Sequence, residues 1–293
     1  MANYNRQSIF HPPQGRLRLR DDFPWRGKLR TAVVPSASQY IGQNLVDLAG
    51  GPRFGATSTA GPAGRAYSMG QFGRGHEFAN NTAFRQSRSY AAWRPFSVGG
   101  GYGPYTQLFY GERFANPSGV QVTAAAYTVA GGTSGDTPVT LMYNDQGDNS
   151  MHAILVMSNG GTVVNLTATN PTRGQPFMMA FVSKSQTSHE FVFWNVKTGY
   201  MNAATSSSNV GTATGDSVIE LICNDMTGSG TPTSTIGEYI VYGAFFLEYG
   251  MSRSEVYAWF NNPFLMVEPE DQRRFYLGGL STMRGLYTPA IMS

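Results

Sequence analysis

The hydrophobic positions of this chain recur in short segments that are separated by turn residues. Apolar residues alternate with polar ones, or run on continuously, between clusters of Gly, Asn, Asp and Ser, and this pattern is typical of β-strands. The clearest segments predict strands at residues 107–110, 120–129, 139–143, 152–157, 162–168, 178–184, 190–195, 218–223 and 239–248, with weaker ones at 31–38, 66–72 and 75–78. No repeat of fixed period is present in the sequence, which disfavours a propeller or a solenoid. The spacing therefore predicts an all-β, antiparallel sandwich.

The last predicted strand carries apolar residues at nearly every position, so we expect it to be buried on both faces. Strict alternation places one set on one face, namely Tyr239, Val241, Phe245 and Leu247. The other set then lies on the opposite face, namely Ile240, Tyr242, Ala244 and Phe246.

A short helix is predicted directly after this strand. Ser252 and Glu255 have the spacing of a capping box, in which each side chain accepts a hydrogen bond from the backbone N–H of the other residue. Val256, Trp259 and Phe260 then fall on one helical face. The Asn-Asn-Pro sequence at residues 261–263 ends the helix, because proline cannot continue it.

This order of strand, capped helix and Asn-Pro-aromatic sequence resembles the end of concanavalin A-like (laminin-G-like) jelly-roll domains. It is most similar to the versions found in structural proteins of tailed bacteriophages, and residues 44–51 are similar to a turn near the start of such domains. The resemblance implies a jelly-roll sandwich with a short C-terminal helix. It implies function less specifically, since jelly rolls serve as lectins, hydrolases and assembly modules alike.

The chain divides into three predicted parts. Residues 1–30 form an extended, Arg-rich arm, residues 31–267 form the sandwich, and residues 268–293 form a tail. Within the arm, Arg and Leu alternate over residues 16–20, so that in a strand the arginines share one face. We expect Glu268, Glu270 and Asp271 of the tail to face the basic arm of another copy.

The composition indicates a surface that other subunits cover. Only 13% of the residues are charged, and only three of the 21 basic residues are lysines (Lys28, Lys184 and Lys197). Arginine is favoured over lysine where planar, hydrogen-bonded contacts are made to partners. Residues 1–94 carry 13 basic and 4 acidic residues, whereas residues 95–293 carry 8 and 14. A basic end on an acidic body favours docking between copies, so we expect a homo-oligomer that also contacts other virion proteins.

The predicted docking residues lie in the arm: Arg16, Leu17, Arg18, Leu19, Arg20, Phe23, Trp25, Arg26 and Arg30. The apolar members would be buried on a neighbouring subunit, and the arginines would donate charge-assisted hydrogen bonds to it. Trp25 is the expected hot spot. Removal of residues 1–30 is then expected to leave a folded, monomeric sandwich. Nucleic-acid binding is disfavoured, because Asp21 and Asp22 interrupt the basic patch.

Catalytic motifs are absent from the sequence. There is no Gly-x-Ser-x-Gly elbow, Walker loop, dinucleotide fingerprint or His-Glu-x-x-His, and no strand alternates two Glu and one Asp as glucanases of this fold would. We therefore predict a protein that is not an enzyme and has no cofactor. Asp145 and Asp148 crowd one loop that would suit calcium, but a hairpin turn accounts for them better.

Sugar binding is the alternative function. A sugar site needs an exposed aromatic side chain beside short polar groups, and Trp93, Tyr102, Tyr105 and Tyr110 flank a glycine-rich loop at residues 99–103. Core or subunit packing of these aromatics is favoured over a glycan platform.

We therefore predict a bacteriophage virion structural protein: a capsid decoration, head-fibre or tail component. A lectin-like module for host-surface glycans comes second, and a glycoside hydrolase or lyase third. The first thirty residues lack the apolar region of a secretory signal, and no apolar run in the sequence is long enough to span a membrane. We expect the protein to be made in the host cytoplasm and incorporated into the virion.

Overall fold

The structure is a computed structural model. It describes residues 10, 12–13, 15–35, 45–51, 75, 103–112, 175–185, 187–207 and 240–270 with their side chains. It also gives the backbone of further strand residues, at 40–41, 44, 55–58, 68–70, 73–74, 76–78, 82–88, 113, 121–130, 139–144, 150–156, 162–169, 216–223 and 239.

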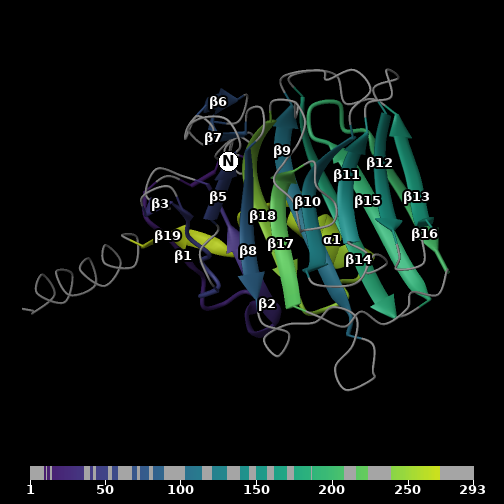
Figure 1. Ribbon diagram of the computed structural model, residues 1–293, viewed down its shortest axis with the longest axis horizontal. Helices are drawn as coiled ribbons and strands as arrows, with labels where there is room; N and C mark the ends of the chain where they lie inside the picture. Colours follow the sequence, from purple (N-terminus) through teal and green to yellow (C-terminus); the bar gives the residue numbers. More distant parts are fainter. Residues whose placement is uncertain are drawn as a thin grey trace, which may run out of the picture.

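Two stacked antiparallel sheets form the body of the molecule (Figure 1). The seven-stranded sheet has the order β13 (Thr162–Thr169), β12 (Ser150–Val156), β11 (Val139–Asn144), β10 (Gln121–Ala130), β17 (Asp216–Cys223), β8 (Thr82–Arg88) and β5 (Gly55–Ser58). The eight-stranded sheet has the order β16 (Met201–Ser206), β15 (Ser188–Asn195), β14 (Pro176–Ser185), β9 (Tyr105–Arg113), β18 (Tyr239–Leu247), β7 (Gly73–Phe78) and β6 (Ser68–Gly70), with β2 (Leu29–Val33) also paired to β18. The all-β, antiparallel prediction is confirmed.

Two short strand pairs, one α-helix and one 3₁₀ turn complete the described fold. The strand β1 (Leu17–Leu19) pairs with β19 (Val267–Pro269), and β3 (Tyr40–Ile41) pairs with β4 (Asn44–Leu45). The helix α1 (Arg253–Asn261) follows β18, and a single 3₁₀ turn, η2 (Arg26–Lys28), precedes β2. The predicted boundary between arm and sandwich, at residues 30/31, falls inside β2. The predicted boundary between sandwich and tail, at residues 267/268, falls inside β19.

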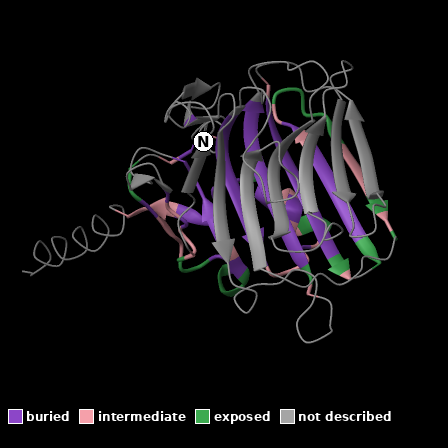
Figure 2. Ribbon diagram, viewed as in Figure 1, coloured by how far each residue is buried: buried purple, intermediate pink, exposed green. Residues whose placement is uncertain are grey.

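The central strands of the eight-stranded sheet are buried on both faces, whereas the edge strand β16 is exposed or only partly buried. The first eight residues of β14 are all buried, as is every described side chain of β18 from Ile240 to Leu247 other than the glycine (Figure 2). One face packs against α1 and the N-terminal segment, in a cluster that includes Leu108, Met178 and Val192. The residues that alternate with these, such as Phe109 and Phe177, lie on the opposite face. The prediction of a final strand that is buried on both sides is confirmed.

The predicted assignment of faces in this strand is wrong for half of it. Ile240 and Tyr242 share one core cluster with Phe245 and Leu247, although strict alternation separates these two pairs. The cause is a register shift between Val241 and Gly243 in the pairing of β18 with β9. An extra residue in one strand inverts the alternation beyond it, and such a bulge is not visible in a strand whose two faces are both apolar.

The capping box at the start of α1 is confirmed. The Ser252 hydroxyl accepts from the backbone N–H of Glu255 at 3.3 Å, and the Glu255 carboxylate accepts from the backbone N–H of Ser252 at 2.7 Å. Val256, Trp259 and Phe260 are buried on one face, as predicted. After the helix, the Trp259 indole N–H donates to the carbonyl of Pro263 at 3.0 Å, which fixes the exit of the chain.

The N-terminal segment from residue 15 to residue 30, which we call the strap, lies on the C-terminal part of its own chain. Leu17, Phe23 and Trp25 are at most 6% exposed and belong to the same core cluster as α1. The Trp25 indole N–H donates to the Glu255 carboxylate at 2.8 Å, and the backbone N–H of Glu248 donates to the carbonyl of Lys28 at 2.8 Å. The strap is therefore an integral part of the fold of a single chain.

Candidate functional site

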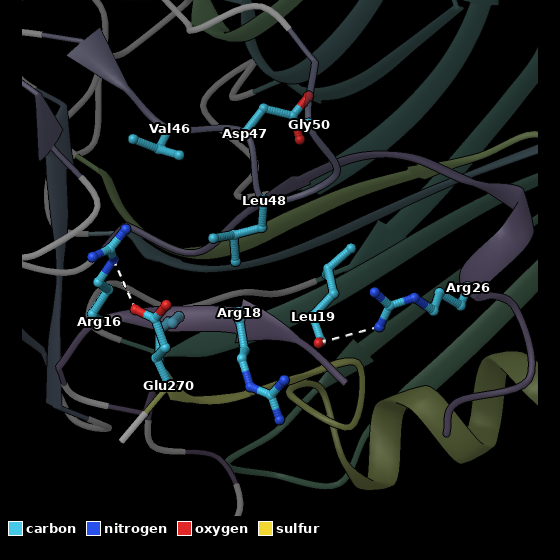
Figure 3. Close-up of a pocket in the computed structure, with 10 residues that line it drawn as sticks. Arg16, Arg18, Leu19, Arg26, Val46, Asp47, Leu48, Gly50 and Glu270 are labelled. Atoms are coloured by element: carbon cyan, nitrogen blue, oxygen red, sulfur yellow. Dashed lines mark hydrogen bonds and ion pairs between the residues drawn. The ribbon is translucent and has the colours of Figure 1, made fainter. Parts of the chain in front are cut away.

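A pocket of about 590 Å³ opens between the strap and the loop that follows β4 (Figure 3). Arg16, Arg18 and Arg26 contribute the basic groups, and Asp47 and Glu270 contribute the acidic ones. The remaining lining residues are small or apolar: Leu17, Leu19, Val46, Leu48 and Gly50. A concave surface of this size that combines apolar and convergent polar groups is the best candidate site among the described residues.

Pairing between β1 and β19 builds one wall of the pocket. Arg18 lies opposite Glu268 in this register, and Leu17 lies opposite Pro269. The ladder continues beyond the strand, because the backbone N–H of Glu270 donates to the carbonyl of Arg16 at 2.7 Å. Two segments about 250 residues apart in sequence are thus fixed against each other.

Asp47 shapes the opposite wall. It is buried, and its Oδ1 accepts from the backbone N–H groups of Ala32 and Ala49, both at 2.9 Å. These bonds tie the loop to β2. The turn closes at Gly50, whose φ of +81° lies in the left-handed region that favours glycine. The apolar side chains of Val46 and Leu48 are held over the pocket as a result (Figure 3).

The pocket arginines differ in how firmly they are held. Arg18 pairs with Glu268, and Arg26 pairs with Asp21 at 2.7 Å while also donating to the carbonyl of Leu19 at 3.3 Å. Arg16 pairs with Glu270 at 2.8 Å, but its side chain is 75% exposed, against 24% for Arg18 and 44% for Arg26. Arg16 is therefore the pocket arginine that solvent, or a ligand, reaches most readily.

Arg18 holds the least satisfied donor of the three. Its Nε is buried, and none of the described residues accepts a hydrogen bond from it. A buried donor without an acceptor costs free energy, and a ligand oxygen placed beside it would remove that cost.

A second charged cluster lies next to the pocket but outside it. Arg20 donates to both carboxylate oxygens of Asp22, at 2.8 Å and 2.7 Å. This hydrogen bonding raises the pKa of Arg20 and lowers the pKa of the Asp22 carboxyl. Arg30 of the strap also pairs with a carboxylate, donating from Nε to Oε2 of Glu248 at 2.8 Å. The acidic residues at 21–22 therefore neutralise the strap locally.

The predicted docking residues lie together in the strap, but their contacts correct part of the prediction. Leu17, Phe23 and Trp25 are buried within their own chain, so they do not present an apolar surface to a neighbouring subunit. Leu19 is partly buried against the same core. Glu268 and Glu270 do face the basic segment, as expected, but they face that of their own chain. Docking by the arginines on another subunit remains a prediction.

The predicted aromatic platform is corrected for two of its four residues. Tyr105 and Tyr110 are completely buried on β9, where neither can stack on a sugar. Tyr110 packs on Tyr242 with ring centroids 4.8 Å apart, and its hydroxyl donates to the carbonyl of Phe10 at 3.1 Å. Burial raises the pKa of Tyr110 well above its usual value. Trp93 and Tyr102 lie outside the described residues, as do Asp145 and Asp148.

Two buried polar pairs elsewhere have the geometry of catalytic pairs. The Ser183 hydroxyl lies 2.7 Å from Nδ1 of His189, and the Tyr242 hydroxyl donates to Glu112 at 2.6 Å. All four residues are at most 2% exposed, so these pairs join neighbouring strands and are closed to a substrate. Within the described part of the chain no three His, Cys, Asp or Glu side chains gather as a metal site.

Among the described residues, no helix is long and apolar enough to cross a lipid bilayer.

Sequence reasoning missed the pocket because its walls come from four separate segments. The signal that could have found it is the charge complementarity between the arginines at 16–20 and the acidic residues at 268–270, which were expected to meet between copies.

Comparisons with known proteins give the fold and little more. No family model matches the chain, and no curated protein sequence matches it. Among solved structures, Trypanosoma rangeli sialidase in complex with sialic acid superposes with a TM-score of 0.55 at 13% identity, over 82% of this chain and 34% of the sialidase. The binding domain of botulinum neurotoxin serotype D/C superposes with a TM-score of 0.51 at 7% identity, over 80% of this chain and 52% of that domain.

A phage protein is also among the similar structures. Full-length tailspike protein 2 of Escherichia coli O157:H7 bacteriophage CAB120 gives a TM-score of 0.50 at 12% identity, over 73% of this chain and 27% of the tailspike. This chain therefore matches about a third of the sialidase, half of the toxin domain and a quarter of the tailspike. At these identities the likeness shows a shared β-sheet fold.

Proposed function

We propose that this chain is a non-catalytic structural subunit of a bacteriophage virion, in the form of a capsid decoration, a head fibre or a tail component. The observation that carries the proposal is the closing unit: β18, the capping box at Ser252, α1 and the Asn-Pro exit followed by the buried Phe264. Its sequence resembles the end of jelly-roll domains in phage structural proteins. The tailspike among the similar structures agrees with this context.

We infer that the sandwich is a concanavalin A-like jelly roll. In the eight-stranded sheet β9 pairs with β18, and in the seven-stranded sheet β10 pairs with β17. The chain therefore crosses between the sheets after β9 and again after β17, as a long two-stranded ribbon does when it wraps round a core. Nested pairing of this kind supports a jelly roll over two separate meanders.

Two sets of contacts and one comparison support a non-catalytic function. The acidic residues Glu268 and Glu270 are held by Arg18 and Arg16, so they are not a free pair of carboxylates for acid–base chemistry. The Ser183–His189 pair is buried between β14 and β15. The similar sialidase structures match this chain over only about a third of their own length. At 12–13% identity, the similarity assigns no catalytic residue to this chain.

Location in the particle tests this proposal. We expect the chain to copurify with intact virions at a fixed stoichiometry, and a cryo-electron microscopy map of the particle to contain its two-sheet body. The same map would show which face docks on neighbouring subunits and whether copies of the chain contact each other. Absence of the protein from purified, infectious particles would contradict the proposal.

A carbohydrate-binding module is the second candidate function, and the strap pocket is the observation that favours it. Its lining combines apolar side chains with charged groups, as small-molecule sites do, and aliphatic side chains take the place of the aromatic one that was expected from the sequence. Binding of the purified chain to a panel of host-surface glycans would favour this candidate, and turnover of a polysaccharide would favour a hydrolase or lyase over both.

A further inference from the structure

We propose that the strap pocket binds a carboxylated sugar and that Arg16 recognises its carboxylate. This inference goes beyond the proposed structural role in the virion, and it rests on the second candidate function, carbohydrate binding, which it makes more specific. It assigns a ligand class to a pocket that the docking prediction did not anticipate.

The size and lining of the pocket favour a sugar ring. Its volume of about 590 Å³ lies within the range typical of small-molecule sites, about 300–1,000 Å³. Val46, Leu48 and Leu19 offer aliphatic surface, and Arg16 and Glu270 lie at one side of it (Figure 3). A pyranose has C–H faces and a polar rim, and in this pocket the aliphatic side chains, in place of an aromatic ring, would contact its C–H face. A single sugar ring is therefore the ligand that we place in the pocket, and a glutamate-rich peptide is the alternative that the test below compares with it.

The charge distribution singles out Arg16 as the ligand-binding group. Arg18 holds the strap to the C-terminal segment through Glu268, and Arg26 is held within the strap by Asp21. Arg16 is bound only to Glu270 among the pairs described, and both side chains are exposed, at 75% and 39%. Exposed ion pairs contribute little to stability, so the Arg16–Glu270 pair can open at small cost. The planar guanidinium, which contacts Glu270 through Nε at 2.8 Å, is then free to donate two parallel N–H groups to an incoming carboxylate.

This arrangement makes Glu270 a competitor of the ligand. The Glu270 carboxylate occupies the position that a sugar carboxylate would take, so removal of its charge should strengthen binding. A neutral sugar would behave in the opposite way, because Glu270 would then be needed to accept hydrogen bonds from ring hydroxyls. Stronger binding to Glu270→Gln therefore indicates a carboxylated sugar, and weaker binding indicates a neutral sugar.

The test compares methyl glucuronoside with methyl glucoside, which differ only in the carboxylate. We would titrate each into the purified full chain and follow the binding by NMR or calorimetry. We expect the glucuronoside to bind at least about tenfold more tightly, the range of a charge-assisted hydrogen-bond pair. Arg16→Gln should abolish this preference. Glu270→Gln should strengthen glucuronoside binding by up to about fivefold, the strength of an exposed ion pair.

Arg253→Gln is the matched control. Arg253 is also an exposed arginine, 51% accessible and paired with a glutamate, Glu190, but it lies on α1 and does not line the pocket. We expect this variant to bind the glucuronoside as the unaltered chain does. Thermal unfolding of Arg16→Gln and Glu270→Gln should differ little from that of the unaltered chain, which separates loss of binding from loss of folding. Arg253→Gln leaves the buried Glu190 carboxylate with Lys184 alone at 3.5 Å, so it should lower the stability without changing the binding.

Four results would overturn the inference. They are no measurable binding of the glucuronoside, equal binding of the two glycosides, weaker binding after Glu270→Gln, or tighter binding of a glutamate-rich peptide than of the glucuronoside. The last would indicate a protein partner in place of a sugar. None of these results bears on whether the chain is found in virions, so the inference and the proposed function fail independently.

Discussion

Glu255 shows how one side chain joins three segments of the chain. It accepts from the backbone N–H and the hydroxyl of Ser252, from the indole of Trp25 and from the hydroxyl of Tyr249. The capping box alone is a local device that fixes the start of α1. The hydrogen bonds from Trp25 and Tyr249 add tertiary contacts to it, so the strap and the end of β18 are held to the helix through the single carboxylate of Glu255.

Trp25 is the first residue at which this junction can be tested. Because its ring is 6% exposed and donates to Glu255, we expect Trp25→Ala to lower the free energy of unfolding by about 3–5 kcal/mol. Trp25→Phe keeps most of the apolar ring but loses the hydrogen bond, so we expect it to lower the free energy of unfolding by about 1–2 kcal/mol. Urea unfolding measures both. Met201→Ala, at a residue that is 40% exposed, serves as the control and should change little.

An unchanged stability of Trp25→Ala would show that the indole packs elsewhere. The strap would then be available to another subunit, as the sequence alone suggested.

The pH dependence of stability gives a second prediction at this residue. Burial raises the pKa of Glu255, but hydrogen bonds from Ser252, Trp25 and Tyr249 outweigh it, and the pKa is lowered from its usual 4.5. A depressed pKa in the folded state stabilises the protein above the unfolded value, and this contribution is lost as the pH falls through the folded value. We expect the stability difference between the unaltered chain and Glu255→Gln to be full at pH 7 and to shrink as the pH falls below about 4.5. A difference that stayed constant down to low pH would contradict the prediction.

At the scale of elements, β18 depends on the close approach of its neighbours. It pairs with β9 along its whole length, and also with β7 at residues 239–241 and with β2 at residues 244–247. Its bulge lies between these last two pairings. Gly111 of β9 lies opposite Val241 in this region. A Cβ atom at Gly111 would lie 2.8 Å from the ring of Phe109 and 2.9 Å from the carbonyl oxygen of Ile240. The bulged pairing therefore requires glycine at this position.

This requirement predicts the effect of Gly111→Ala. The added methyl group meets backbone as well as a buried ring, so we expect a loss of about 1–3 kcal/mol in the free energy of unfolding, as for other overpacked cores. Gly27→Ala is the matched control, because nothing lies within 4 Å of the Cβ that it would add. Denaturant unfolding of the two variants compares them directly. Equal stability of both would mean that β9 and β18 are not packed as closely as described.

The elements that sequence could predict are those that depend on neighbouring residues. Ser252 and Glu255 are three positions apart, and their capping box followed from that spacing alone. The strands near residues 178–184, 190–195 and 239–248 followed from apolar runs that are bounded by turns. The bulge at residues 241–243 could not be predicted from the sequence. Both faces of this strand are apolar, so an inserted residue does not change the pattern of apolar positions along it.

The pocket and the strap could not be predicted for a different physical reason. The partners of Arg16 and Arg18 lie about 250 residues further along the chain, and opposite charges attract equally well within one chain or between two. In the same way, the burial of Tyr105 and Tyr110 follows from the pairing of β9 with β14 and β18, which their own sequence does not encode.

At the scale of the whole molecule, the strap completes the sandwich. It covers the outer face of the eight-stranded sheet together with α1, and it joins the N-terminal and C-terminal parts through β1–β19 and β2–β18. Its apolar side chains are buried, whereas its arginines lie at the surface and are paired with carboxylates of the same chain. Any docking of this region on a neighbour would therefore use charged groups around an already folded strap.

Deletion of residues 1–28 tests this view, and it should have the opposite outcome to that expected from the sequence. The deletion removes Leu17, Phe23 and Trp25 and exposes the core around Trp259 and Val267. Because burial of each large apolar side chain contributes about 1.5–3 kcal/mol, the loss is comparable to the whole stability of a typical domain. We expect the shortened chain to unfold or aggregate, as seen by circular dichroism and light scattering. The full-length Arg16→Gln variant, which loses only an exposed ion pair, should stay folded within about 1 kcal/mol of the unaltered chain. A shortened chain that remained monomeric and unfolded cooperatively near the original midpoint would show that the strap is an arm after all, free to dock on another subunit.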